Sequence, residues 1–274
     1  DSRLVLCKLL ELGYKNIETF SYGVAKNHEM KMAEAVAKQL GVRWRAINSN
    51  LRDLKEIFAS ETRKNYARVA DGLHMVPTYL DYEAIHFLVT QNLIPKDAVI
   101  INGYSGDFLF GGHIPEQLAI EPSVSLLITK ILEKHCSHIS SSRLATIRED
   151  IFSTIKLEME GLLAGDHSAE SLCAGYEYWD WRERQTKAVV NGQRVYEYFG
   201  LDWLLPLWDK ELVEYWSTVR LEDKVNQKFH IEYLKHMNYG GVFDQLRSPN
   251  QLWLPSWCWM PFLGKLVELL TGKA

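Results

Sequence analysis

The chain has 274 residues, of which 47% are hydrophobic and 24% charged, and its formal net charge is −4. This balance is ordinary for a globular protein, and it gives no general attraction to nucleic acid or to an anionic membrane surface. No run of about eighteen apolar residues occurs, so no transmembrane helix is predicted, and the length favours two lobes.

The first part of the chain alternates between helical and strand patterns. Apolar residues recur at helical spacing in the segments 4–12, 29–40 and 77–93. Short apolar runs typical of strands occupy 17–22, 42–47 and 98–101. This alternation predicts βαβ units, and hence an α/β fold with a doubly wound parallel sheet. Ligands bind at the carboxyl ends of the strands in such sheets.

A glycine-rich stretch follows the third predicted strand. Its sequence from Asn102 to His113 is NGYSGDFLFGGH, with four glycines around a single acid, Asp107. A flexible turn would explain the glycines alone. A loop whose backbone lies against a phosphate or a metal ion would explain both the glycines and the acid.

Beyond His113 the pattern becomes helical and, from Glu177, aromatic. Eight of the nine tryptophans lie beyond residue 178, which favours a core of large rings over an aromatic interface. The polar segment 137–143 is expected to be an exposed loop, and 254–270 an amphipathic helix or cover. We therefore expect an α/β lobe over residues 1–113 and a mostly helical lobe over 114–274.

The cysteines are scattered and form no CxxC pair. This favours reduced thiols and a cytoplasmic protein over a disulfide scaffold. A short cluster of His and Cys residues has no second cluster to complete a tetrahedral zinc site, so we interpret it as part of a surface helix. The cysteines are Cys7, Cys136, Cys173 and Cys258, and the short cluster is His135, Cys136 and His138.

The chain begins inside an amphipathic helix, at Asp1 and Ser2. An Asp at the start of a helix can be merely a cap, and on its own this is the favoured interpretation. A helix start that follows a strand and a turn is also an anion site, because its free amide groups point at the anion.

Five segments, in order along the chain, resemble motifs of the asparagine synthetase family. DSRLVL resembles the end of the family's SGGxDS(S/R) pyrophosphate loop, and NGYSGDFLFGGH resembles its SGEGxDExFGGY signature. Residues 19–42 are similar to its second strand and helix, 201–216 to its RxPFLDxxLVE segment, and 219–235 to its lysine-bearing stretch. The second signature is most similar to divergent bacterial members found with surface-polysaccharide genes, which suggests a sugar acid or a similar carboxylate as acceptor.

The resemblance implies an adenine nucleotide alpha hydrolase-like fold and a synthetase that uses ATP and Mg²⁺. Members of the family activate a carboxylate by adenylation, release pyrophosphate and pass the acyl group to an amine. It implies Asp1 and Asp107 as metal ligands and Lys228 as the cation that neutralises departing pyrophosphate. Nucleotide or pyrophosphate contacts would come from Ser2, Phe20, Ser21, Tyr22, Gly103 and, as a weaker candidate, Lys224.

The signature also departs from the family pattern. Tyr104 and Phe108 stand where the family carries glutamates, and the first of these glutamates serves acyl transfer. A Tyr at this place resembles the lactam-forming synthetases, where it assists proton removal from the attacking amine. Tyr104 as a catalyst and Tyr104 as a pocket wall both stay open.

We expect the chain to be the C-terminal part of a longer polypeptide. The nitrogen would be ammonia, or would come from glutamine through an N-terminal domain or a partner outside this chain, and the acceptor would be a small-molecule carboxylate. The leading hypothesis is an amide-forming synthetase resembling asparagine synthase (glutamine-hydrolysing). The alternatives are a lactam- or macrolactam-forming cyclase and a non-catalytic nucleotide-binding scaffold.

Overall fold

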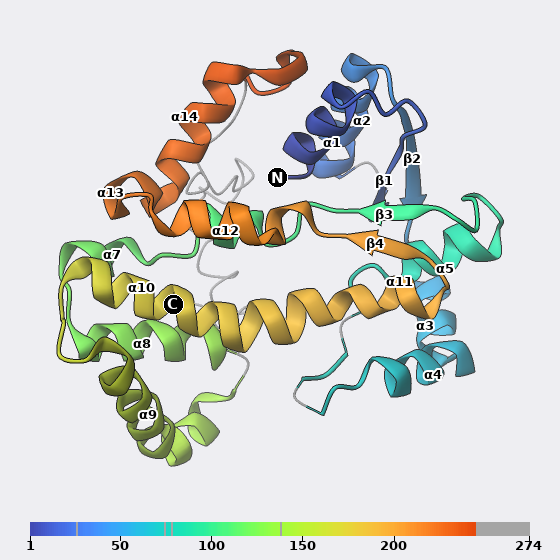
Figure 1. Ribbon diagram of the computed structural model, residues 1–274. Helices are drawn as coiled ribbons and strands as arrows, with labels where there is room; N and C mark the ends of the chain where they lie inside the picture. The colour runs from blue at the N-terminus through green and yellow to red at the C-terminus, as the bar shows by residue number, and fades with distance from the viewer. Residues whose placement is uncertain (26, 74, 78, 138, 245–274) are drawn as a thin grey trace, which may run out of the picture.

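The structure is a computed structural model that describes residues 1–25, 27–73, 75–77, 79–137 and 139–244. Within these ranges the chain is mostly helical, with two small parallel sheets (Figure 1). The helix or cover expected at 254–270 lies outside the described residues. No helix in these ranges is both long and apolar enough to cross a membrane.

The first part of the chain alternates helices and strands, as expected. Its elements are α1 (Ser2–Glu11), β1 (Glu18–Gly23), α2 (His28–Leu40), β2 (Arg43–Asn48), α3 (Leu51–Ala59), α4 (Glu61–Ala70), α5 (Tyr82–Thr90), β3 (Val99–Ile101) and α6 (Gly106–Leu109). Helices α3 and α4 were not predicted from the sequence, and the helix expected at 77–93 is shorter, at Tyr82–Thr90.

The second part is mostly helical. Its elements are α7 (Glu116–Ile120), α8 (Val124–His135), α9 (Ser141–Leu163), α10 (Ala169–Asp180), the π-helix η1 (Trp181–Val190), η2 (Asn191–Gln193), α11 (Arg194–Tyr198), β4 (Asp202–Leu204), η3 (Pro206–Trp208), α12 (Lys210–Ser217), α13 (Leu221–Lys224), η4 (Val225–Gln227), α14 (Lys228–Met237) and η5 (Tyr239–Gly241). The loop expected at 137–143 is wrong in part, since α9 already begins at Ser141. Serine is favoured at helix starts, so these serines mark a helix boundary.

Helix α2 shows how local sequence sets an element. The side chain of Asn27 accepts a hydrogen bond of 2.8 Å from the amide of Met30 and so caps the first turn. The helix ends at Gly41, whose φ of 68° is left-handed and suits glycine. Met30 and Ala37 are buried on its inner face.

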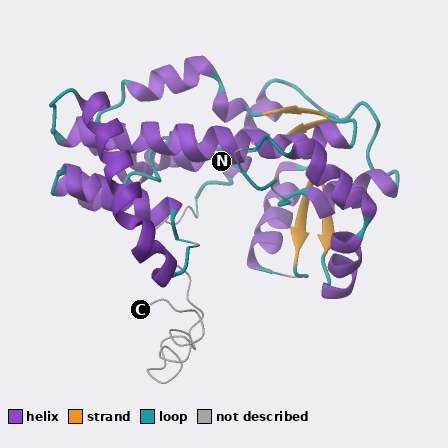
Figure 2. Ribbon diagram, turned by 90° about the horizontal axis from the view of Figure 1, so that it is seen from below, coloured by secondary structure: helices purple, strands orange, loops and turns teal. Residues whose placement is uncertain are grey.

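The strands of the described residues pair in parallel, as predicted, but in two sheets of two strands each and not in the single doubly wound sheet that was expected. β1 pairs with β2 from Glu18–Arg43 to Gly23–Asn48. β3 pairs with β4, with Ile100 opposite Trp203. Figure 2 shows the two strand pairs apart from each other. The expected strands at 17–22, 42–47 and 98–101 are thus present within a residue at each end, while β4 comes from a segment that was not predicted to pair.

A long run of helix crosses the molecule from α10 through η1 and η2 to α11 (Figure 1). It connects a helical core, formed around α7, α8, α9 and α10, with a core formed by β2, β3, α4, α5 and α11. A further core joins α1 and α6 to α12 and α14. The π-helical part is notable because π-turns are uncommon and occur frequently at functional sites.

Candidate active site

The glycine-rich loop packs directly on the start of α1. A Cβ added to Gly103 would lie 2.5 Å from the backbone nitrogen of Ser2. One added to Gly106 would lie 2.4 Å from the carboxyl carbon of Asp1. Real Cβ atoms do not come so close, so both glycines are needed where the two segments meet. The carboxyl group of Asp1 therefore lies beside the residue that precedes Asp107.

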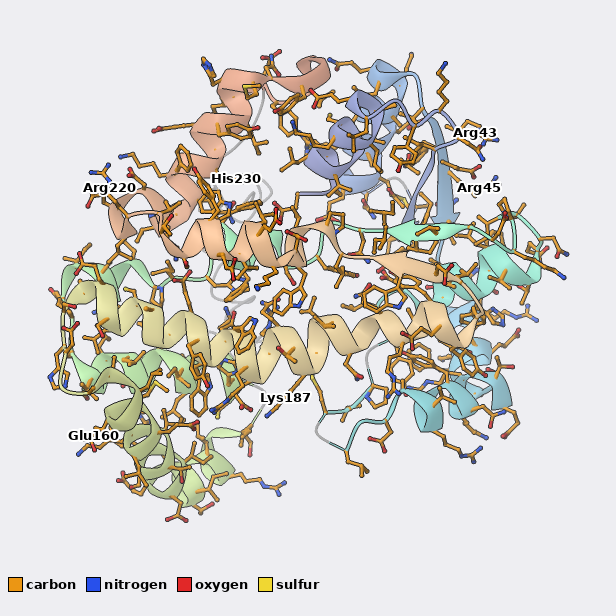
Figure 3. All side chains as sticks on the ribbon, in the orientation of Figure 1. Arg43, Arg45, Glu160, Lys187, Arg220 and His230 are labelled. Atoms are coloured by element: carbon orange, nitrogen blue, oxygen red, sulfur yellow. The ribbon has the colours of Figure 1, made fainter. Side chains whose placement is uncertain are left out.

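Asp1 also faces a buried histidine on α14. His230 is 3% exposed, and its Nε2 lies 3.6 Å from an oxygen of Asp1 and has no hydrogen-bond partner. The ring stacks on Phe110, with 3.5 Å between the ring centroids. Burial lowers the pKa of His230 to about 3, so the imidazole is neutral. Figure 3 shows this residue on α14.

Asp107 lies in the first turn of α6, and both of its carboxylate oxygens have partners. The amide of Phe108 donates to Oδ1 at 2.9 Å, and Nε2 of His113 lies 2.8 Å from Oδ2. Partial desolvation in the site would by itself raise the pKa of Asp107. The hydrogen bond and charge of His113 and the Phe108 amide outweigh this desolvation and lower the pKa.

His113 also contacts Asp180, deeper in the protein, and this contact was not predicted from the sequence. Its Nδ1 lies 2.6 Å from Oδ2 of Asp180, a residue with no exposed surface. Burial would lower the pKa of His113, but the two carboxylates raise it above its usual value. Asp180 has its own pKa lowered to about 2, since His113 and Lys134 outweigh its burial. The available signal was the histidine at the end of the signature, where the family pattern has tyrosine.

Tyr104 donates a hydrogen bond to Asp81, which the sequence analysis had not singled out. The Tyr104 hydroxyl lies 3.1 Å from each oxygen of Asp81. Tyr22 and Tyr196 donate to the same carboxylate, each at 2.5 Å. Burial and the charge of Asp81 raise the pKa of all three tyrosines, so all three remain donors at neutral pH. Tyr104 thus meets Tyr22, a predicted nucleotide contact, at a shared carboxylate.

The two candidate lysines differ in their surroundings. Lys224 is 8% exposed, and its ammonium group lies 2.7 Å from a carboxylate oxygen of Glu177. Lys228 begins α14 and is exposed, and its side chain forms no hydrogen bond or ion pair with another described residue. The segment packs on the glycine-rich loop, because a Cβ on Gly111 would lie 2.4 Å from the carbonyl oxygen of Lys224.

The remaining predicted contacts lie at α1 and β1. Ser2 is the exposed first residue of α1. Ser21 accepts a hydrogen bond of 3.2 Å from the indole of Trp44, and Phe20 packs on the core around α5 and α11. Next to this strand, β2 carries Arg43 and Arg45, both labelled in Figure 3; Arg45 pairs with Glu18.

The donor set of Asp1 and Asp107 fits magnesium. Mg²⁺ prefers oxygen ligands and is usually held by one or two carboxylates together with substrate phosphates. Among the residues that the structure describes, no group of three or more His, Cys, Asp or Glu side chains could hold a metal ion. In the short cluster of His135, Cys136 and His138, Nε2 of His135 lies 3.6 Å from Oδ1 of Asp180. His138 lies outside the described residues.

These features define an α/β protein in which a glycine-rich loop, after a strand, meets the start of a helix. A comparison with protein-family models matches residues 1–240 to the family described as asparagine synthase. The match covers most of the chain, and the protein therefore belongs to the asparagine synthase family. It is a family of ATP-dependent, amide-forming synthetases, which generally use Mg²⁺. A search of curated proteins found no match.

Proposed function

We propose that this protein activates a carboxylate with ATP, releases pyrophosphate and forms an amide. The observation that carries this proposal is the contact between the two signature segments. Gly103 and Gly106 lie against Asp1 and Ser2, although about a hundred residues of chain separate the two segments. The free amides at the start of α1 and the acid of the second signature are thereby brought to one place, as binding of a nucleotide and its metal ion requires.

In the first half-reaction, a carboxylate oxygen attacks the α-phosphorus of ATP and the bond to pyrophosphate breaks. Asp1 and Asp107 would hold Mg²⁺, which neutralises charge on the phosphates. Ser2, the α1 amides and the backbone of Gly103 would contact the phosphates, and the adenine would lie near residues 20–22. Lys228 is exposed and free of other described partners, so its ammonium group is available to departing pyrophosphate.

In the second half-reaction, an amine attacks the acyl carbon, AMP leaves and the amine loses a proton. Tyr104 is the candidate proton carrier, because its hydroxyl donates to Asp81 and can pass its own proton to that carboxylate as it takes one from the amine. Tyr104 in place of the family glutamate also favours the second candidate function, a lactam- or macrolactam-forming cyclase. In that case the amine and the carboxylate belong to one substrate. Otherwise the nitrogen is ammonia or comes from glutamine hydrolysed elsewhere, and the acceptor is a small carboxylate such as a sugar acid.

The experiment is exchange of labelled pyrophosphate into ATP by the natural full-length protein, with a panel of carboxylic acids. An active synthetase gives exchange that depends on one class of acid, and Asp107→Asn abolishes it. The matched control is Asp97→Asn, which changes an exposed acid before β3. Absence of exchange with every acid, combined with retained ATP binding, would favour the scaffold alternative.

A further inference from the structure

The loop that carries Asp107 is tied to one buried carboxylate by two separate hydrogen-bonded connections. The first runs from Asp107 through His113 to Asp180, at 2.8 and 2.6 Å. The second runs from Ser105 to Gln185 at 3.1 Å, and from Gln185 to Asp180 at 3.4 Å. Both connections end on Oδ2 of Asp180, so they hold the first turn of α6 at two points. We call this set of hydrogen-bonded residues the bracket: Ser105, Asp107, His113, Asp180 and Gln185.

The interior end of this bracket is fixed. Asp180 and Gln185 have no exposed surface, and Ser105 is 3% exposed. Lys134 lies 3.3 Å from Oδ2 of Asp180 and provides the countercharge that a buried carboxylate needs. The outer end differs, because the Asp107 side chain is 56% exposed. The bracket thus joins an exposed acid to an anchor that cannot move without disrupting the core.

The π-helix explains why Gln185 reaches Asp180. In an α-helix, residues five apart differ in direction by about 140° and do not share a face. A π-helix has its backbone hydrogen bonds between residues five apart, which brings such residues close together. Gln185 lies in η1, five residues after Asp180, and so the uncommon winding has a specific consequence for the site.

His113 is poorly placed to bind a metal itself. Each of its ring nitrogens is within hydrogen-bond distance of a carboxylate oxygen, Asp107 on one side and Asp180 on the other. Neither nitrogen has a lone pair directed at open space. Its contact instead restricts rotation of the Asp107 carboxylate, whose other oxygen is already held by the Phe108 amide.

We propose that His113 is a positioning residue, which, anchored by Asp180, holds the Asp107 carboxylate in the orientation that binds the divalent cation. This inference rests on the proposed function, in which Asp107 is a metal ligand. Partners that orient ligating carboxylates typically affect metal affinity by about 10- to 100-fold.

The test is Mn²⁺ affinity, measured by the electron paramagnetic resonance signal of free Mn²⁺ with a non-hydrolysable ATP analogue, on the full-length protein without turnover. In His113→Asn the side-chain amide lies near the position of the histidine Nδ1, on the side of Asp180, and the contact with Asp107 is lost. We therefore expect Mn²⁺ binding to be weaker by about tenfold or more. His113→Gln can still donate to Asp107 and should lose less. His167→Asn, at an exposed histidine, is the control and should leave the affinity unchanged.

Unchanged Mn²⁺ affinity in folded His113→Asn would overturn the proposal, and so would an equal loss in the Asn and Gln variants. A purely structural role would lower the unfolding temperature without changing the affinity of the folded protein. If His113→Asn does not fold, His113→Gln must bind Mn²⁺ more weakly than the unaltered protein, or the proposal fails. Asp107→Asn separates the two hypotheses, since unchanged Mn²⁺ binding in that variant would contradict the metal site of the proposed function itself.

Discussion

Lys224 on α13 and Glu177 on α10 form an ion pair within the protein, with 2.7 Å between the ammonium nitrogen and the carboxylate oxygen. Their side chains are only 11% and 18% exposed. The pair fastens the lysine-bearing segment to the long helix that crosses the molecule. Lys224 therefore stabilises the packing of this segment, whereas Lys228, four residues further along and beyond a break in the helix, is exposed.

This pair predicts a non-additive effect on stability. Burial raises the pKa of Glu177 in spite of Lys224, so the charged pair only partly offsets its desolvation. Lys224→Met alone leaves a buried carboxylate without its partner and should cost about 3–5 kcal/mol of unfolding free energy. Lys224→Met combined with Glu177→Met should recover most of this loss. Denaturant unfolding of both single variants and the double variant measures the coupling; additive losses would contradict it.

Two glycines should respond to alanine in opposite directions. Gly111 has a φ of 84°, and its added Cβ would meet the Lys224 carbonyl oxygen at 2.4 Å. Gly111→Ala should therefore destabilise the protein by about 2 kcal/mol or more. Gly161 in α9 has nothing within 4 Å of an added Cβ, so Gly161→Ala should stabilise it by about 0.5–1 kcal/mol. Equal unfolding midpoints for Gly111→Ala and Gly161→Ala would contradict this prediction.

The buried thiols should resist alkylation in the folded protein. Cys7 is 3% exposed and Cys173 is 1% exposed, and burial raises the pKa of both, that of Cys173 to about 12. Thiolate and access are both required for reaction, so iodoacetamide at pH 8 should label Cys136, which is half-buried, before either of them. Peptide mass spectrometry follows each site. Rapid labelling of Cys173 without denaturant would show that the α10 core opens readily.

His135 should make the protein sensitive to acid. Burial lowers its pKa, with Lys134 and Arg184 adding to this and Asp180 and Glu183 opposing it. Below pH 6.5 the unfolded chain gains a proton on this residue that the folded protein resists, so the contribution of His135 to stability falls as the pH drops from about 7 toward 5.5. Unfolding free energies at both pH values should differ less in His135→Gln than in the unaltered protein. A control variant at the exposed His236 should keep the original difference.

Local signals account for the elements that the sequence predicted well. Helix α2 has an amphipathic pattern, a polar cap at Asn27 and a left-handed Gly41, and each of these features depends on neighbours in the sequence. β4 has no such signal. It has three residues, and it forms only because Ile100 and its neighbours lie opposite residues 202–204. Helix α4 is largely polar, and with only Tyr66 and Ala70 buried it has too few apolar residues to be recognised as a core helix from the sequence.

The same division applies to the candidate site. Asp107 could be singled out from its glycine-rich surroundings, because the motif is contiguous. The buried carboxylate behind His113 could not, since Asp180 lies 67 residues beyond His113 and meets it only after α10 has packed in the core. Asp81 likewise reaches Tyr104 and Tyr196 from a separate helix start. Contacts of this kind depend on tertiary packing, for which a single sequence has no periodic pattern.

Tyr104 decides which chemistry follows adenylation. Tyr104→Phe removes one hydroxyl, but Asp81 keeps its hydrogen bonds from Tyr22 and Tyr196, so the fold should persist. If Tyr104 carries the proton lost by the amine, the variant should retain pyrophosphate exchange while amide formation slows by about 10²-fold or more and changes its pH dependence.

The matched control is Tyr196→Phe, which removes another hydroxyl from the same carboxylate. Tyr196 is almost fully buried, at 1% exposure, and so cannot take a proton from the substrate. Its loss should lower stability, and any effect on rate should be the same in both half-reactions. A proton-carrying Tyr104 is thus recognised by a loss confined to amide formation. Equal losses in exchange and amide formation on Tyr104→Phe would mean that its hydroxyl only shapes the site through Asp81, and no loss in either would remove the main support for the lactam-forming alternative.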